Sequence, residues 1–355
     1  YNYLSKARNT IRRIESSPAS DQAKALYAGE AKALRGWMAL TLYDLFGPVP
    51  VASDEVLDDP QTFVYLPRLT DEEYDEMMEN DLRDAIRDLP EVAEARGRMT
   101  KGAARMILLK YYMIRGFFDR AETLARELAD MEGSVYGLQP DYNHVFSKEG
   151  IGNNEIILQL PCNSTVSWYS NYMTAEILPA DYPWADRAEG WGGYVMPWDF
   201  YNTFDPADVR RSSLITAYVN KNGEHIDRTN STQLSCGALP LKYGLDPDMQ
   251  ATQSGIDVIV YRFSDVLLTL AECIARNQGR PTDEAIGLVN RVRHRAGLPD
   301  LDATATGSQE AFLDALLLER GHEFYLEGLR RQDLIRFGKY VEYANGRINA
   351  INTAE

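Results

Sequence analysis

The sequence has few of the residues that close a fold covalently or hold a metal ion. Its 355 residues include three cysteines, which lie far apart and form no CxxC pair, so it encodes neither a disulfide framework nor a zinc knuckle. The four histidines are dispersed. The motifs GxSxG, GxxxxGK[ST], HExxH and GxGxxG are absent. The sequence therefore shows none of these catalytic motifs, and no cofactor is predicted.

Long apolar runs and basic runs are also missing. No stretch approaches the roughly 18 uninterrupted apolar residues of a membrane-spanning helix, and no run of Lys or Arg is longer than two. Acidic residues outnumber basic ones by 53 to 37, which gives a net charge of −16. A field of that sign repels phosphate backbones and polyanionic glycans. Nucleic acid is therefore not an expected partner, and neutral ligands are favoured.

Apolar residues recur at helical spacing towards both ends of the chain. Residues 21–46 are predicted to form one long helix, which ends at Gly47. Thr70 and Glu73 fit a capping box, in which each side chain accepts a hydrogen bond from the backbone of the other residue. A helix from there to about Leu89 is expected.

A helix, glycine, helix pattern occurs twice. In the first copy, at 100–132, Thr100 is predicted to cap a helix that ends at Gly116. The second copy, at 264–296, turns at Gly279. The spacing is typical of a tetratricopeptide unit, in which a small residue lets two antiparallel helices approach closely. Such hairpins stack into a scaffold without chemistry of its own, so the function is expected elsewhere.

The middle of the chain has a different character. Strands are predicted at Glu155–Leu160 and Val258–Tyr261, with sequence rich in Gly, Pro, Asn and Ser between them. We predict a mainly α fold, in which a tetratricopeptide-like frame of helical hairpins carries an irregular, loop-rich insertion with a few short strands. The expected parts are an N-terminal helical frame (1–139), a ligand-binding insertion (140–260) and a C-terminal frame (261–355). The two frames are expected to pack together as one compact unit.

Aromatic residues are concentrated in the insertion. Eleven of the 37 in the chain lie between Trp168 and Phe204, including four of the five tryptophans. Sugar rings have flat apolar faces edged by hydroxyl groups, so a carbohydrate site needs exposed rings and polar side chains. Packing in a loop-rich core is the alternative, and is expected for Trp198, Phe200, Tyr201 and Phe204. The predicted ligand-binding residues are Trp168, Asp181, Tyr182, Trp184, Asp186, Arg187, Trp191 and, in a proline-rich loop, Tyr65.

Two acidic patterns have structural interpretations. Glu319, Glu323 and Glu327 recur every four residues, and we interpret them as an ion-pair network with nearby arginines rather than as a glycosidase acid and base. The turns Asp205–Asp208 and Asp246–Asp248 offer carboxylates to a structural calcium ion. Turns rich in Asp and Pro are common without a metal, so no calcium is predicted.

Several motifs occur in a fixed order along the chain. They are Glu30–Trp37, Asp44–Pro50, Thr100–Ala104, Tyr261–Leu268 with Ala271 and Glu272, Val289–Arg293 with Ala296–Leu298, and Glu319, Arg320, Glu327, Gly328, Arg330 and Asp333–Arg336. Together they resemble the SusD/RagB family, the surface nutrient-binding lipoproteins of Bacteroidetes. Their order and spacing across some 300 residues make a chance similarity improbable.

The resemblance implies a non-catalytic protein that captures oligosaccharides and delivers them to a SusC-type TonB-dependent transporter at the surface of the outer membrane. A peptide-binding subunit like RagB, or a tetratricopeptide scaffold that binds only protein, are the alternatives. Family members begin with a signal peptide and a lipidated cysteine and continue further, so this chain is expected to be trimmed at both ends. Membrane contact is expected only through an N-terminal lipid anchor that this chain lacks. Since no shared motif fixes the ligand residues, the site prediction rests on the aromatic residues.

Overall fold

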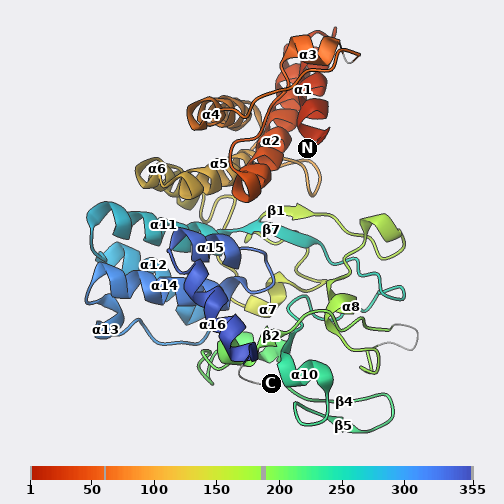
Figure 1. Cartoon of the computed structure of the whole chain (residues 1–355), viewed down its shortest axis with the longest axis vertical. Coiled ribbons are helices and arrows are strands. Elements are labelled where there is room, and N and C mark those ends of the chain that lie inside the picture. Colours follow the sequence, from red (N-terminus) through yellow and green to blue (C-terminus); the bar gives the residue numbers. More distant parts are fainter. Residues whose placement is uncertain (1, 60, 185–188, 353–355) are drawn as a thin grey trace. The chain divides into compact units, whose positions relative to one another are not determined.

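The computed structural model describes residues 2–59, 61–184 and 189–352. It divides into two compact units, unit 1 (Tyr1–Val135) and unit 2 (Tyr136–Glu355), each described here by itself (Figure 1). The predicted mainly α class, with helical hairpins and a few short strands, is confirmed. The three-part division at 139 and 260 stays a prediction. Within the described ranges, no helix has both the length and the apolar character needed to cross a bilayer.

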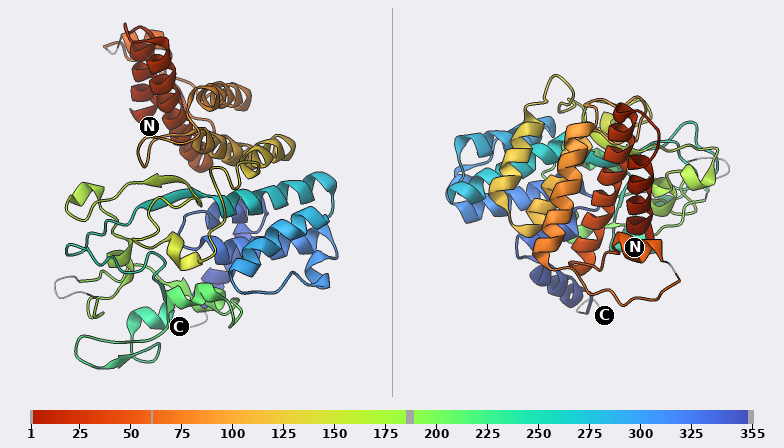
Figure 2. Two further views of the ribbon diagram at one scale, coloured as in Figure 1. Left: turned by 180° about the vertical axis from the view of Figure 1, so that it is seen from behind. Right: turned by 90° about the horizontal axis from the view of Figure 1, so that it is seen from above.

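Unit 1 consists of helices. They are α1 (Asn2–Glu15), α2 (Asp21–Phe46), α3 (Asp54–Asp58), α4 (Asp71–Asp88), α5 (Lys101–Arg115) and α6 (Phe118–Ala129). The long helices lie side by side, with α2 packed against α1, α4 and α5, and α5 against α6 (Figure 2).

Local signals in the sequence set the ends of these helices. Helix α2 has the predicted bounds. The capping box of Thr70 and Glu73 is present, and the Thr100 hydroxyl accepts a hydrogen bond from the first turn of α5. Gly116 ends α5 with a φ of 74°, a left-handed conformation that glycine adopts without strain. The hairpin of α5 and α6 is the first predicted tetratricopeptide-like pair.

Unit 2 combines helices with short strands. Its helices are α7 (Tyr142–Val145), η1 (Ser167–Tyr169), α8 (Met173–Ile177), α9 (Trp198–Tyr201), η2 (Val209–Ser213), α10 (Thr232–Cys236), α11 (Phe263–Gln278), α12 (Asp283–Arg295), α13 (Ala303–Thr306), α14 (Gln309–Phe324), α15 (Arg330–Arg336) and α16 (Tyr340–Asn352). Its strands are β1 (Ile156–Leu160), β2 (Met196–Pro197), β3 (Leu214–Ile215), β4 (Tyr218–Val219), β5 (His225–Ile226), β6 (Gly237–Pro240) and β7 (Val258–Arg262).

The strands form three small antiparallel groups. Both predicted strands are confirmed, and they pair as β1 with β7, so that Ile156 faces Arg262 and Leu160 faces Val258. Strand β6 lies between β2 and β3, and β4 pairs with β5 as a hairpin. Helices α11 and α12 form the second predicted hairpin, with Gly279 in the left-handed conformation after α11. The longer helices α11, α12 and α14 lie to one side of unit 2, and the loop-rich segment with the short helices α8 and α10 lies to the other (Figure 1).

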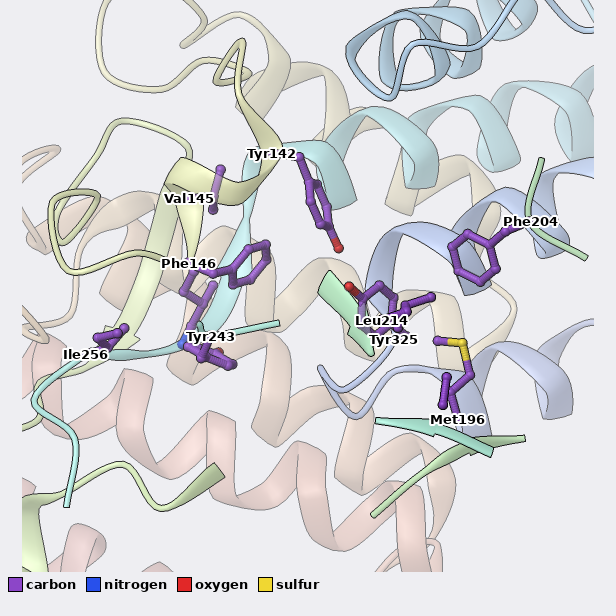
Figure 3. Close-up of a cluster of buried hydrophobic side chains, with 11 residues drawn as sticks. Tyr142, Val145, Phe146, Met196, Phe204, Leu214, Tyr243, Ile256 and Tyr325 are labelled. Carbon is purple, nitrogen blue, oxygen red and sulfur yellow. The ribbon is translucent and has the colours of Figure 1, made fainter. Parts of the chain in front are cut away.

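A hydrophobic cluster joins the loop-rich segment to the helices. It brings together α7, the strands and the end of α14 around the rings of Tyr142, Phe146, Tyr243 and Tyr325 (Figure 3). The expected interior packing of four aromatic residues is confirmed. Phe204 is buried in this cluster, and Trp198, Phe200 and Tyr201 pack against it. The indole of Trp198 also donates to the carbonyl of Leu234 at 2.8 Å.

A buried ion-pair network lies beside this cluster. Glu323 contacts three guanidinium groups, those of Arg210 at 3.0 Å, Arg262 and Arg295. Burial alone would raise the pKa of Glu323, but these three cations hold it well below its usual value. The ion-pair interpretation of the acidic repeat is confirmed for Glu323. Its partners, however, come from η2, β7 and α12 rather than from the neighbouring arginines of the sequence.

The other two glutamates of the repeat are also paired. Glu319 accepts hydrogen bonds from Arg210 at 2.7 Å and from Arg293 at 3.1 Å. Glu327 accepts from Arg262, at 2.7 Å, and from Lys242. Both carboxylates are therefore paired with cationic side chains in the interior, and each neutralises a cation that would be costly to bury alone.

The imidazole of His322 is expected to make stability depend on pH. Its Nε2 lies 2.8 Å from the Thr203 hydroxyl, and burial, with the nearby charges of Arg210, Arg330 and Arg293, lowers its pKa to about 3. The unfolded chain, with a pKa near 6.5, binds more protons between these values, so stability falls as the pH falls below 6.5. We expect a loss of about 2 kcal/mol between pH 6.5 and 5.

Urea unfolding at pH 7, 6 and 5 would measure this loss. His322→Gln should have a flatter profile than the wild type, because glutamine does not titrate in this range. His225→Gln, which changes an exposed histidine of the same unit, should keep the wild-type slope. Parallel profiles for His322→Gln and the wild type would contradict the assignment.

Candidate functional site

Two aromatic rings, one exposed and one partly buried, form a stacked pair on the loop-rich side of unit 2. The rings of Tyr172 and Trp191 lie 5.8 Å apart between centroids, with 18° between their planes. Trp191 is 56% exposed. We call Tyr172 and Trp191 the aromatic platform. A large, flat and accessible apolar surface of this kind matches the apolar face of a sugar ring.

The turn that carries Trp191 is fixed to the end of α8 by its backbone. The amide of Trp191 donates to the carbonyl of Ala175 at 2.6 Å, that of Gly192 to Leu178 at 3.0 Å, and that of Gly193 to Glu176 at 2.6 Å. These carbonyls lie in the last turn of α8 or just beyond it, where helices leave acceptors unpaired. The turn satisfies them and sets the direction of the indole.

Gly190 allows the turn to approach α8 this closely. A Cβ atom built on Gly190 would lie 1.8 Å from the carbonyl oxygen of Leu178, well inside van der Waals contact. Gly192 has a φ of 63°, which favours glycine. The Gly-Trp-Gly sequence therefore has a physical reason: small residues on both sides let the tryptophan sit on a tightly held turn.

Tyr172 is held in place by a hydrogen bond to the segment that precedes it. Its hydroxyl donates to the carbonyl of Ser167 at 2.8 Å. Ser167 begins η1, the short helix that carries Trp168, whose side chain is 81% exposed. The predicted residues Trp168 and Trp191 therefore lie on two segments that Tyr172 connects. Tyr172 belongs to the aromatic-rich region but was not among the predicted ligand residues.

Gln233, which lies on α10, forms hydrogen bonds to the segments on either side of the turn that carries Trp191. Its Nε2 donates to the carbonyl of Ile177 at 2.7 Å and to that of Tyr194 at 3.4 Å, so one amide connects the end of α8 with the residues after Trp191. No sequence signal points to this residue, because its partners lie about 40 and 56 positions away. We interpret Gln233 as a positioning residue.

Tyr182 and Trp184 lie differently from the platform. Both are partly buried and pack against the hydrophobic cluster of Ile177, Leu178 and Leu234. Burial raises the pKa of the Tyr182 hydroxyl. The Nε1 of Trp184 is buried and has no hydrogen-bond partner among the residues described. Their packing supports the loop beneath the surface, and their roles in ligand binding stay predictions.

The remaining predicted residues are separate from this pair. The Asp181 carboxylate accepts hydrogen bonds from the Tyr218 hydroxyl at 2.8 Å and from Asn220 at 3.3 Å, which ties the β4–β5 hairpin to the loop. Asp186 and Arg187 lie outside the described residues. Tyr65 belongs to unit 1, where it is 88% exposed and packs edge-on against Phe63. Their ligand contacts likewise stay predictions.

In the two turns considered for calcium, carboxylates form an ion pair or hydrogen bonds with other groups of the chain. Asp208 forms an ion pair with Arg210 at 2.7 Å. Asp246 accepts from the amide of Gly255 at 2.6 Å and from the hydroxyl of Ser254 at 3.1 Å. Across the described residues, no group of three or more His, Cys, Asp or Glu side chains is placed to hold a metal ion.

Comparison with known proteins gives consistent results for sequence and fold. The SusD family model matches residues 154–355. The "SusD-like protein P2" of Formosa agariphila is 25% identical over 339 residues, which span 90% of this chain and 67% of that protein. The "Starch-binding protein SusD" of Bacteroides thetaiotaomicron is 35% identical over 114 residues, which span 30% of this chain and 19% of that protein.

Solved structures share the fold. Surface glycan-binding protein A from Bacteroides uniformis superimposes with a TM-score of 0.75 at 25% identity, covering 94% of this chain and 71% of that one. Surface glycan-binding protein A from Bacteroides thetaiotaomicron, solved in complex with laminarihexaose, gives 0.74 at 22% identity, covering 95% and 74%.

Proposed function

Because the chain belongs to the SusD family, as its ordered motifs predicted, we propose that it captures oligosaccharides on the aromatic platform and delivers them to a SusC-type TonB-dependent transporter. Members of this family are non-catalytic glycan-binding proteins, so the prediction that the chain is not an enzyme is confirmed. The observation that carries the proposal is the exposed ring of Trp191, stacked on Tyr172 and carried by a turn that hydrogen-bonds to α8.

The geometry of the platform suits capture of a ligand without reordering of the rings. An indole stacked on a phenol ring is held in place before the ligand arrives, so little side-chain entropy is lost on binding. Trp168 offers a second exposed ring on η1, the segment that Tyr172 contacts. Two accessible rings on connected segments would engage more than one sugar unit of a chain.

The charge of the protein supports a neutral ligand. With a net charge of −16, the chain as a whole repels polyanions. We therefore propose a neutral oligosaccharide rather than a uronic acid polymer. Two similar proteins, a starch-binding protein and a glycan-binding protein solved in complex with laminarihexaose, suggest neutral glucans for a first test.

Calorimetry and affinity gels against plant, microbial and host glycans would test the proposal. We expect at least one neutral glycan to bind, and Trp191→Ala to weaken that binding at least about tenfold, since truncating a central aromatic contact usually has a large effect. Tyr3→Ala, which removes an exposed ring from α1 of unit 1, is the matched control and should bind as the wild type does.

The outcome can also reject the proposal. Wild-type affinity in Trp191→Ala would remove the platform from the site. Binding of peptides in place of every glycan would favour a subunit like RagB, and a stable transporter complex without any small ligand would favour a protein-binding scaffold.

The proposed location is the surface of the outer membrane, where SusD family proteins of Bacteroidetes are found. Delivery requires physical contact with the transporter. Co-expression with a SusC-type partner, followed by affinity purification of this chain, should recover both proteins. Failure to recover the transporter while glycan binding persists would contradict delivery but leave capture intact.

A further inference from the structure

A cavity of unit 2 is lined by residues of α9, α14, α15 and α16 and by the segment around β2. It is partly open and has a volume of about 600 Å³, within the range of about 300–1,000 Å³ that small-molecule sites occupy. Its walls are mainly apolar, and include Met196, Phe200, Leu334 and Tyr340. Neither ring of the aromatic platform lines it. A sugar, with a hydroxyl on nearly every carbon, is a poor fit for such walls.

One arginine in this cavity has no carboxylate partner among the residues that the structure describes. The Nη1 of Arg330 donates to the carbonyl of Leu317 at 2.7 Å, and the guanidinium lies over the rings of Phe200, at 5.2 Å, and Tyr343, at 5.3 Å. Its Nη2 is buried without a hydrogen-bond partner in the described part of the chain. Burial lowers the pKa of Arg330 below its usual value, and the nearby charge of Asp333 and a hydrogen bond with Tyr343 offset this only in part.

The cavity is locally basic in an acidic protein. Three arginines line it, and among the described residues Asp199 is the one acidic side chain of the lining. Arg320 is neutralised by Asp265 and Asp333. Arg347 pairs with Asp199 at 3.1 Å, but this contact is half-exposed and therefore weak. Among the described arginines of the lining, Arg330 therefore has no carboxylate in ion-pair contact, and its charge is opposite in sign to the −16 of the whole chain.

We propose that this cavity binds a small apolar carboxylic acid, with its hydrocarbon or aromatic body against α16 and its carboxylate neutralising Arg330. Apolar walls favour the body, and a single cation without a carboxylate in ion-pair contact among the described residues favours one negative charge. A polar anion without an apolar body would gain little from these walls. The site is separate from the platform and goes beyond glycan capture.

Isothermal titration of the whole chain with trans-cinnamate would test the proposal, with cinnamamide as the neutral analogue of the same shape. We expect cinnamate to bind at least about tenfold more tightly than cinnamamide, because a charge-assisted contact is lost in the amide. Arg330→Met should weaken cinnamate binding by a similar factor while keeping an apolar side chain. Arg280→Met, which changes an exposed arginine outside the cavity, is the matched control.

A second variant covers the case in which Arg330→Met is misfolded. Ala344→Phe adds a ring on α16, where Ala344 lines the cavity and is partly exposed, and should prevent cinnamate binding without lowering the melting temperature. Equal affinities for cinnamate and cinnamamide, absence of cinnamate binding at millimolar concentration, or full binding by Ala344→Phe would each overturn the proposal. Glycan affinity should stay unchanged in both variants.

Discussion

Replacing Gly190 with alanine is expected to reduce glycan affinity more than tenfold while leaving both platform rings in the chain. The new Cβ would lie 1.8 Å from the backbone oxygen of Leu178, so the turn has to move away from α8. That movement breaks the hydrogen bonds from Trp191, Gly192 and Gly193 to the end of the helix. The indole then loses its fixed direction, and binding has to supply the entropy of ordering it again.

The glycan that binds the wild type most tightly, measured by calorimetry, is the appropriate ligand for this comparison. Gly287→Ala is the matched control, because nothing lies within 4 Å of a Cβ built there on α12. It should bind normally and be slightly more stable, since alanine favours helix. An affinity within twofold of the wild type for Gly190→Ala would show that the position of the turn does not matter for binding.

Glu323→Gln is expected to lower the free energy of unfolding of unit 2 by about 3–5 kcal/mol, the range for removing one partner of a buried ion pair. Glu323 is fully buried and faces Arg210, Arg262 and Arg295. Glutamine keeps the shape of the side chain but removes the charge, which leaves three buried guanidinium groups with one fewer anion. Because the pKa of Glu323 is lower in the folded state than in the unfolded chain, its contribution to the free energy of unfolding is complete above about pH 4.5. This contribution is lost as the pH falls through the pKa of Glu323 in the folded state.

Urea unfolding followed by tryptophan fluorescence would measure the effect, because four of the five tryptophans belong to unit 2. Glu342→Gln, at an exposed position on α16, should change stability by less than about 0.5 kcal/mol. The double variant Glu323→Gln with Arg295→Met should recover part of the loss, because it also removes one of the three cations that Glu323 balances. A decrease of less than about 1 kcal/mol in the free energy of unfolding for Glu323→Gln would mean that other carboxylates neutralise the three arginines without Glu323.

Features set by neighbouring residues were predicted well. The bounds of α2, the capping box of Thr70 and the turn at Gly116 depend on hydrogen bonds within a few residues, so the local sequence contains their cause. The strands β1 and β7 were also predicted. The packing of Trp198 and Phe204 followed from their spacing and from the turn after them.

The arrangement of the platform could not be predicted in the same way. Trp191 was predicted as a ligand residue. Its stacking on Tyr172 and the hydrogen bonds that Gln233 makes around its turn were not predicted. Their contacts join segments separated by about 20 to 55 positions through irregular loops, which have no periodicity from which spatial neighbours can be inferred. Trp184 has a sequence environment similar to that of Trp191, yet it packs against a hydrophobic cluster instead of standing exposed.

By itself, the sequence determined the helical class, the caps and the order of motifs that identify the SusD family, because each depends on local periodicity or on residue identity. The tertiary structure decided which aromatic side chains are exposed and which cations find partners. Glu323 was expected to pair with arginines nearby in sequence but pairs with Arg210, Arg262 and Arg295, and Arg330 has no carboxylate among the described residues. Burial and ion pairing depend on distances between segments that only the folded chain brings together.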